Sequence, residues 1–219
     1  MNKVLILILI ISYATNGICQ IPQKGFDPEI AATFNLLNNK PFAEIQLEDT
    51  SGKMFHTSSL LGKTIYVDFW FTGCAPCVKE IPFAKALFQF FADSSDIVFL
   101  SICIQNKEKK EDWKKMVCEK EMPGIQLFYS LNSPQKISLP REFKITYPTY
   151  LLVNKDMKVI GYDAPRPSEE GWAHWAIAQA NRGIYLSASY KAFVEGDTEV
   201  IKFATDNKEK ITAYRPTLP

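Results

Sequence analysis

The feature that most constrains this chain is a pair of cysteines placed just after an apolar segment. The segment TIYVDFWF, residues 64–71, is dense in β-branched and aromatic residues, which is typical of a strand buried on both faces of a sheet. Cys74 and Cys77 follow it, and an apolar stripe over residues 77–92 then predicts a helix. The sequence therefore predicts a CxxC motif between a central strand and the start of a helix.

Such a cysteine pair can hold a metal, attach haem, form a static disulfide or transfer electrons. A c-type haem site needs His directly after the second cysteine, where this chain has Val78. A zinc site needs two more ligands, but Cys103 and Cys118 form no second CxxC, and His56 and His174 lack ligand spacing. We expect neither metal nor cofactor, so a static disulfide and a redox-active pair remain.

The first 19 residues have the pattern of a secretory signal peptide. Lys3 precedes an apolar run over residues 4–11, which is shorter than the ~20 residues of a membrane-spanning helix. Small residues allow cleavage after Gly17 or after Cys19; we expect the second, with lipidation of Cys19 as an alternative. The sequence thus predicts an exported protein, placed in the periplasm, where disulfides can persist.

Length and charge limit the remaining possibilities. Lys and Arg total 25 and Asp and Glu total 24, so the chain has almost no net charge. Its charge therefore gives no reason to predict nucleic-acid binding. The length suits one domain with additional segments. We divide the chain into a signal peptide (1–19), a lead-in (20–40), a domain (41–183) and a C-terminal extension (184–219), in which residues 198–214 are expected to form a helix that packs on the domain.

Local patterns predict an α/β order around the CxxC motif. Strand–helix alternation implies a central parallel pair, and the last hairpin implies antiparallel edges. The other expected elements, in chain order, are a hairpin of strands 42–47 and 53–56, a strand at 96–104, a helix at 107–120, a strand at 125–129, a loop or short helix at 131–143, a hairpin of strands 149–153 and 158–160, and a helix from an N-cap at Ser168 to about Arg182, stopped by Gly183.

This order, with CxxC at a strand end and a helix start, resembles the thioredoxin fold. The segment VDFWFTGCAPC looks like the thioredoxin-family active site. The segments KPFAEIQLEDTSGKMF and ITYPTYLLVNKDMKVIG are similar to parts of the TlpA/ResA-type exported thioredoxin-like proteins. The resemblance covers about residues 41–183. It implies a central mixed β-sheet flanked by helices, with an N-terminal β-hairpin and, beyond the resemblance, a C-terminal helical extension.

The predicted position of the cysteines suggests how they would react. A cysteine at a helix N-terminus faces unpaired backbone N–H groups and the positive end of the helix dipole, and both favour the thiolate. We expect Cys74, with its sulfur on the exposed side, to attack a substrate disulfide. The more buried Cys77 would then release the product. Pro76 fits the first helical turn, where its missing N–H matters little.

Two acids are candidates for proton transfer. Asp68 lies in the apolar strand and should have a raised pKa if it is buried. The resemblance implies that it accepts the proton of Cys77, directly or through water. Glu80 matches the acid that the ResA-type motif carries after its CxxC. The alternatives are an Asp68 that reaches solvent at the strand edge and a Glu80 that is simply solvated.

The resemblance also implies a substrate-binding surface. It places Pro148 in a cis peptide bond that faces the CxxC, so that the backbone of Tyr147 could pair with an extended substrate segment. An apolar docking surface would lie beside the cysteines, although each of its aromatic residues could instead be ordinary core. We assign to this site Trp70, Phe71, Ala75, Pro76, Tyr147 and Pro148.

The predicted function is that of an exported thiol-disulfide oxidoreductase of the TlpA/ResA type. The resemblance favours reduction of disulfides in substrate proteins, apocytochrome c among the candidates, with electrons supplied by a membrane thiol carrier. Two alternatives stay open: a disulfide oxidant or isomerase, and a non-catalytic binding module whose CxxC is a static disulfide.

Overall fold

The computed structural model describes residues 25–217, apart from residue 43 and residues 133–144. The predicted signal peptide, the start of the lead-in and most of the predicted loop at 131–143 lie outside the described residues. None of the helices within the described ranges is long and apolar enough to cross a membrane.

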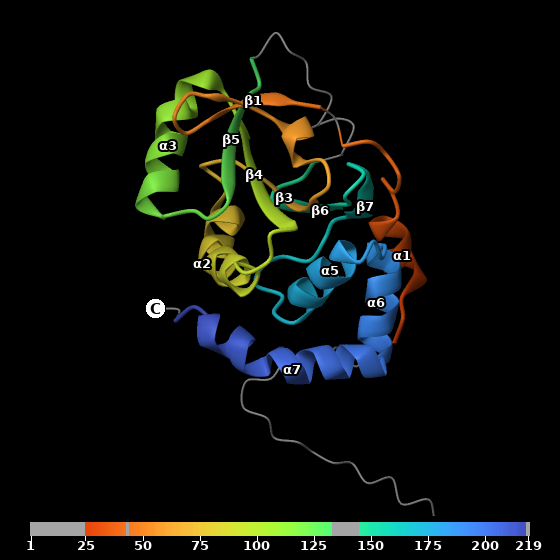
Figure 1. Ribbon diagram of the computed structural model, residues 1–219. Coiled ribbons are helices and arrows are strands. Elements are labelled where there is room, and N and C mark those ends of the chain that lie inside the picture. The colour runs from red at the N-terminus through yellow and green to blue at the C-terminus, as the bar shows by residue number, and fades with distance from the viewer. Residues whose placement is uncertain (1–24, 43, 133–144, 218–219) are drawn as a thin grey trace, which may run out of the picture.

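Among the described residues, seven strands form one mixed sheet in the order β2-β1-β5-β4-β3-β6-β7 (Figure 1). The central strands β3, β4 and β5 are parallel, one strand more than the expected parallel pair, and the remaining pairs are antiparallel, including the predicted hairpin of β6 and β7. The strands are β1 Gln46–Asp49, β2 Met54–His56, β3 Thr64–Trp70, β4 Ile97–Gln105, β5 Ile125–Ser130, β6 Thr149–Val153 and β7 Val159–Tyr162.

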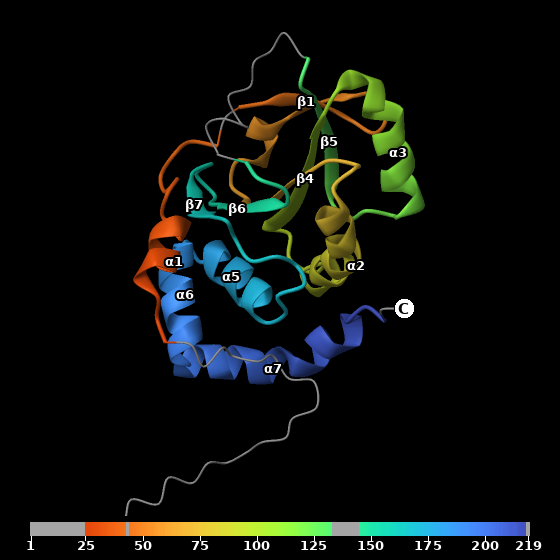
Figure 2. The same ribbon diagram turned by 180° about the vertical axis from the view of Figure 1, so that it is seen from behind.

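The helices gather mainly on one side of this sheet (Figures 1 and 2). Both crossovers, β3-α2-β4 and β4-α3-β5, step in the same direction across the sheet, so right-handed connections place α2 and α3 on one face. The helices are α1 Pro28–Phe34, α2 Ala75–Phe90, α3 Lys110–Glu119, α5 Trp172–Asn181, α6 Leu186–Glu195 and α7 Thr198–Tyr214, with short 3₁₀ turns η1 Thr57–Leu60 and η2 Lys107–Lys109.

Strand β3 is buried on both faces, as its composition predicts. Its side chains alternate, so that Tyr66 and Trp70 pack toward the helices, whereas Ile65, Val67 and Phe69 pack into the core on the other face. Of the side chains of β3, only Asp68 is partly exposed. Its C-terminal end, which leads to the cysteines, is held from both directions.

One predicted helix start is wrong. Ser168 does not cap α5, which begins four residues later at Trp172 with Gly171 as its N-cap. Gly171 has φ +78°, a conformation that glycine adopts without steric cost, and this turns the chain into the helix. Ser168 instead donates hydrogen bonds to Glu80. The predicted stop at Gly183, with φ +80°, is confirmed.

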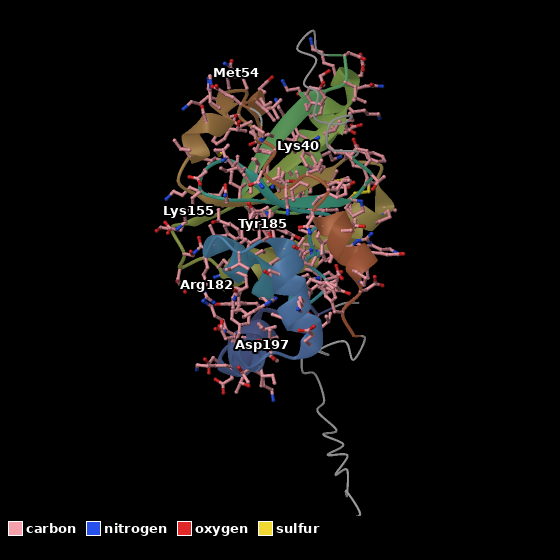
Figure 3. The ribbon with its side chains drawn as sticks, turned by 90° about the vertical axis from the view of Figure 1, so that its right-hand side faces the viewer. Lys40, Met54, Lys155, Arg182, Tyr185 and Asp197 are labelled. Atoms are coloured by element: carbon pink, nitrogen blue, oxygen red, sulfur yellow. A yellow bond between two sulfur atoms is a disulfide. The ribbon has the colours of Figure 1, made fainter. Side chains whose placement is uncertain are left out.

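The C-terminal extension packs on the domain through α6 and α7. The predicted helix at 198–214 is observed as α7, and its Val200 and Ile211 are buried. The sequence analysis missed α6, although its apolar residues recur at helical spacing. Figure 3 shows Tyr185, just before α6, at the boundary between sheet and helices, where its hydroxyl donates to Asn39 Oδ1 at 2.6 Å. Helix α7 lies against α2, with Phe203 close to the rings of Phe90 and Trp175, among other contacts.

Candidate active site

The two cysteines lie at the N-terminus of α2, as predicted. Cys74 is the N-cap residue, and it forms a disulfide with Cys77 across a Cα–Cα distance of 5.3 Å. The backbone N–H of Cys77 donates to Cys74 Sγ at 3.2 Å. When the pair is reduced, this donor and the positive end of a 16-residue helix favour a thiolate at Cys74.

The expected difference in burial between the cysteines is absent in the disulfide form. Cys74 is 4% exposed and Cys77 is 5% exposed. The bridge holds both residues in one apolar cluster, whose other buried members are Trp70, Cys103, Trp113 and Phe128. The assignment of Cys74 as nucleophile therefore rests on its place at the helix end and not on exposure.

The surface beside the disulfide differs in one respect from the predicted docking surface. Ala75 and Pro76 are exposed, and the half-buried Phe71 and Tyr147 pack edge to face with their ring centroids 5.0 Å apart. Trp70 is only 1% exposed, so it supports the disulfide from within and is not part of the exposed surface.

The segment that carries Tyr147 precedes β6 and lies beside the disulfide, although it is distant from the cysteines in sequence. Tyr147 packs against the cluster that contains both cysteines. The Tyr147–Pro148 bond is cis, as in the fold that the sequence resembles, and Pro148 is buried at the start of β6. The structure thus brings Tyr147 next to the CxxC motif, although the two are about 70 positions apart in sequence.

Asp68 lies on the helix-facing side of β3, directly opposite Ser101 of β4. Its Oδ2 accepts a hydrogen bond from the Ser101 hydroxyl at 3.3 Å. Burial raises the pKa of Asp68 to about 7; the Ser101 hydrogen bond opposes this rise, and the charge of Glu80 adds to it. The predicted upward shift is confirmed, and Asp68 can gain or lose a proton near neutral pH.

Glu80 is buried on α2, with 8% exposure, so it is not the solvated helix residue of the alternative interpretation. Both of its carboxylate oxygens accept hydrogen bonds from Ser168, one from the backbone N–H at 2.9 Å and one from the hydroxyl at 2.8 Å. Glu80 therefore ties the active-site helix to the segment between β7 and α5 and places a negative charge near Asp68.

Three residues near this site were missed as site residues by the sequence analysis. Ser101 and Gln126 both lie close to Asp68, and only the strand register, which one sequence does not give, brings them there. Cys103 was predicted as a buried strand residue. It is fully buried beside the disulfide, and burial raises the pKa of its thiol far above the ordinary value. Cys118 is exposed, and neither thiol is in a disulfide.

No group of three or more potential metal ligands occurs within the residues that the structure describes. A disulfide at a helix N-terminus, a half-buried acid with a pKa near neutrality and an apolar rim suit thiol–disulfide exchange.

Comparison with known proteins places this arrangement in a family. Residues 37–174 match the family Redoxin. The chain belongs to the Redoxin family. The match covers the sheet, both cysteines, the cis-proline segment and the first part of α5.

Relatives of this redoxin carry names that agree with its site. It is 26% identical over 149 residues to the thiol-disulfide oxidoreductase ResA of Bacillus subtilis, covering 65% of this chain and 76% of that protein. It is 29% identical over 118 residues to ResA of Bacillus cereus, covering 51% of this chain and 61% of that protein.

A solved structure supports the same assignment. A protein of Bacteroides vulgatus, described as a candidate thiol-disulfide oxidoreductase, superimposes with a TM-score of 0.53 at 29% identity over 62% of this chain and 92% of its own. The thioredoxin fold and the TlpA/ResA-type resemblance predicted from the sequence are confirmed.

Proposed function

We propose that this redoxin is an exported thiol-disulfide oxidoreductase that reduces disulfides in substrate proteins. The observation that carries the proposal is the Cys74–Cys77 disulfide at the N-terminus of α2, where Cys74 Sγ accepts the Cys77 N–H. The relatives named thiol-disulfide oxidoreductases support the class of reaction. The signal-like first 19 residues support export.

The reaction would proceed in two exchanges. The Cys74 thiolate attacks one sulfur of the substrate disulfide; the other substrate sulfur leaves as a thiolate, and a mixed disulfide forms. Cys77 then loses its proton to Asp68, and its thiolate attacks Cys74 Sγ. The Cys74–Cys77 disulfide forms, the second substrate sulfur leaves, and two electrons have passed to the substrate.

The two acids would have different roles in these steps. Asp68 has a pKa near 7, so its ionised form can accept the Cys77 proton and its protonated form can return it when the reaction runs in reverse. Both oxygens of Glu80 are held by Ser168. Glu80 is therefore assigned to raising the pKa of Asp68 through its charge and to fixing α2, and not to proton transfer.

Substrate proteins would dock on the exposed first turn of α2 and on the segment around Tyr147. Ala75 and Pro76 are exposed there, and Phe71 and Tyr147 form an apolar edge. A membrane thiol carrier would return the Cys74–Cys77 pair to the dithiol. Proteins with accessible disulfides, apocytochrome c among them, are the proposed substrates.

Two measurements on a chain that begins at Gln20 test the proposal. In the first, Cys77→Ser should accumulate mixed disulfides on Cys74 that reductant releases, whereas the matched control Cys74→Ser/Cys77→Ser should trap nothing. In the second, equilibration in defined thiol buffers should give a reduction potential near about −270 mV for a reductase, and a value near about −120 mV would indicate an oxidant. A pair that neither traps substrates nor becomes reduced would be a static disulfide.

A further inference from the structure

A small pocket lies on the helix-facing side of the sheet, next to Asp68. It has a volume of about 30 Å³ and is partly open to solvent. This volume is enough for one or two water molecules. The residues of its lining with polar side-chain groups are Tyr66, Asp68, Ser101, Gln126 and Tyr150, and the apolar ones include Ala84 of α2 and Met122 and Pro123, which precede β5.

Two acceptor atoms in the pocket lining have no hydrogen-bond partner within the described residues. They are Asp68 Oδ1 and Gln126 Oε1. Gln126 is only 7% exposed, and its Nε2 donates to the Pro123 carbonyl oxygen at 2.6 Å. That bond fixes the amide, so Oε1 is the oxygen left without a donor. Buried acceptors are almost always satisfied, and water is the donor that a pocket of this size admits.

Two of the titratable groups around Asp68 are already hydrogen-bonded to other residues. The titratable groups that face it are Tyr66 on β3, Cys103 on β4, Tyr150 on β6 and Glu80 on α2. The Tyr66 hydroxyl donates to the Pro165 carbonyl oxygen, and Ser168 occupies both oxygens of Glu80. Ser101 holds Asp68 Oδ2, so Oδ1 is the atom left for exchange with the pocket.

We propose that the proton which Asp68 takes from Cys77 leaves to solvent through this pocket, and that Gln126 is a positioning residue that holds the water at Asp68 Oδ1. The inference rests on the proposed function, because it assigns a proton path to the same site. The proton passes from the Cys77 thiol to the Asp68 carboxylate, then to the water held between Asp68 Oδ1 and Gln126 Oε1, and then to bulk water. No electrons move in this path.

Gln126→Leu tests the role of the amide, because leucine keeps most of the volume and removes the acceptor. Reduced protein is mixed with excess of a synthetic peptide disulfide, and the concentration-independent phase of tryptophan fluorescence reports the attack of Cys77 on the mixed disulfide. Gln126→Leu should slow this phase about tenfold, within the range of general base effects, and should shift its pH profile. Gln179→Leu is the matched control, because Gln179 is 6% exposed on α5, outside the pocket.

A second pair of variants separates a proton path from a general loss of packing. In an Asp68→Asn background, Gln126→Leu should cause no further slowing, because both residues act on the same proton. Equal slowing in both backgrounds, or an unchanged rate and pH profile in Gln126→Leu, would overturn the inference. Should Gln126→Leu not fold, Ser101→Ala is measured in the same two backgrounds and must show the same non-additivity. Failure of the wild type to react with the peptide would instead refute the proposed function.

Discussion

Replacing Asp68 by Asn should make the protein more stable at neutral and alkaline pH, although Asp68 is proposed to be essential for efficient exchange. In the folded disulfide form, burial raises the pKa of Asp68 from its ordinary value of 3.8 to about 7. Asn has nearly the same shape, can still accept the Ser101 hydroxyl, and cannot ionise. The substitution therefore removes a buried charge and little else.

The sign and size of this effect follow from proton linkage. Between pH 3.8 and about 7 the unfolded chain has lost the Asp68 proton while the folded chain keeps it, so the free energy of unfolding falls as pH rises. The contribution is complete below pH 4 and lost above pH 7. At about 1.36 kcal/mol for each pH unit, the loss is about 4 kcal/mol, which Asp68→Asn should restore.

Urea unfolding of the disulfide form, followed by tryptophan fluorescence from pH 4 to pH 8, measures this effect. The difference between Asp68→Asn and wild type should grow from near zero at pH 4 to about 4 kcal/mol at pH 8. Asp49→Asn is the control: the Ser51 hydroxyl lowers the pKa of Asp49, so its difference from wild type should not grow over this interval. A difference between Asp68→Asn and wild type that is independent of pH would refute the reasoning.

Three further predictions concern stability. Burial lowers the pKa of His174 to about 4, so the wild type should lose about 3 kcal/mol of its free energy of unfolding as pH falls from 6.5 to 4. His174→Gln should remove this loss, and a pH profile of urea unfolding equal to that of the wild type would contradict the prediction. Gly161→Ala would place a methyl 2.7 Å from Leu186 Cβ and should lower the free energy of unfolding by about 1–3 kcal/mol, seen as a lower Tm. An unchanged Tm would mean that α6 moves away from β7 at no cost in stability. Ser168→Ala should cost about 1–3 kcal/mol in urea at pH 7, because Glu80 loses its hydroxyl donor; an equal free energy of unfolding would mean that water replaces that donor.

Local patterns were sufficient to predict strand β3, the cysteine pair that follows it and helix α2. A strand buried on both faces has a continuous apolar sequence, and Pro76 is favoured in the first turn of the helix that follows. The raised pKa of Asp68 could also be predicted, because an acid inside such a strand has little access to water. These features depend on neighbours in sequence.

The parts that could not be predicted depend on contacts between distant segments. Ser168 satisfies the usual preference for a helix cap, but the Glu80 carboxylate, 88 positions earlier, binds it instead. Ser101 and Gln126 come to Asp68 through strand register alone. Trp70 was assigned to the docking surface, and only the packing of the cluster around the disulfide shows that it is enclosed.

The core on the helical face has a consequence for how the protein is made. It joins residues from both ends of the described chain, from Ala31 and Phe34 of α1 to Val200 of α7. The ribosome releases the redox strand and helix roughly a hundred residues before Val200, on the order of ten seconds earlier. During that interval the apolar residues of α1 and α2 lack their partners from α5, α6 and α7, whereas Cys103 already has Trp70, Trp113 and Phe128 to enclose it, so the redox site can close before the helical face does.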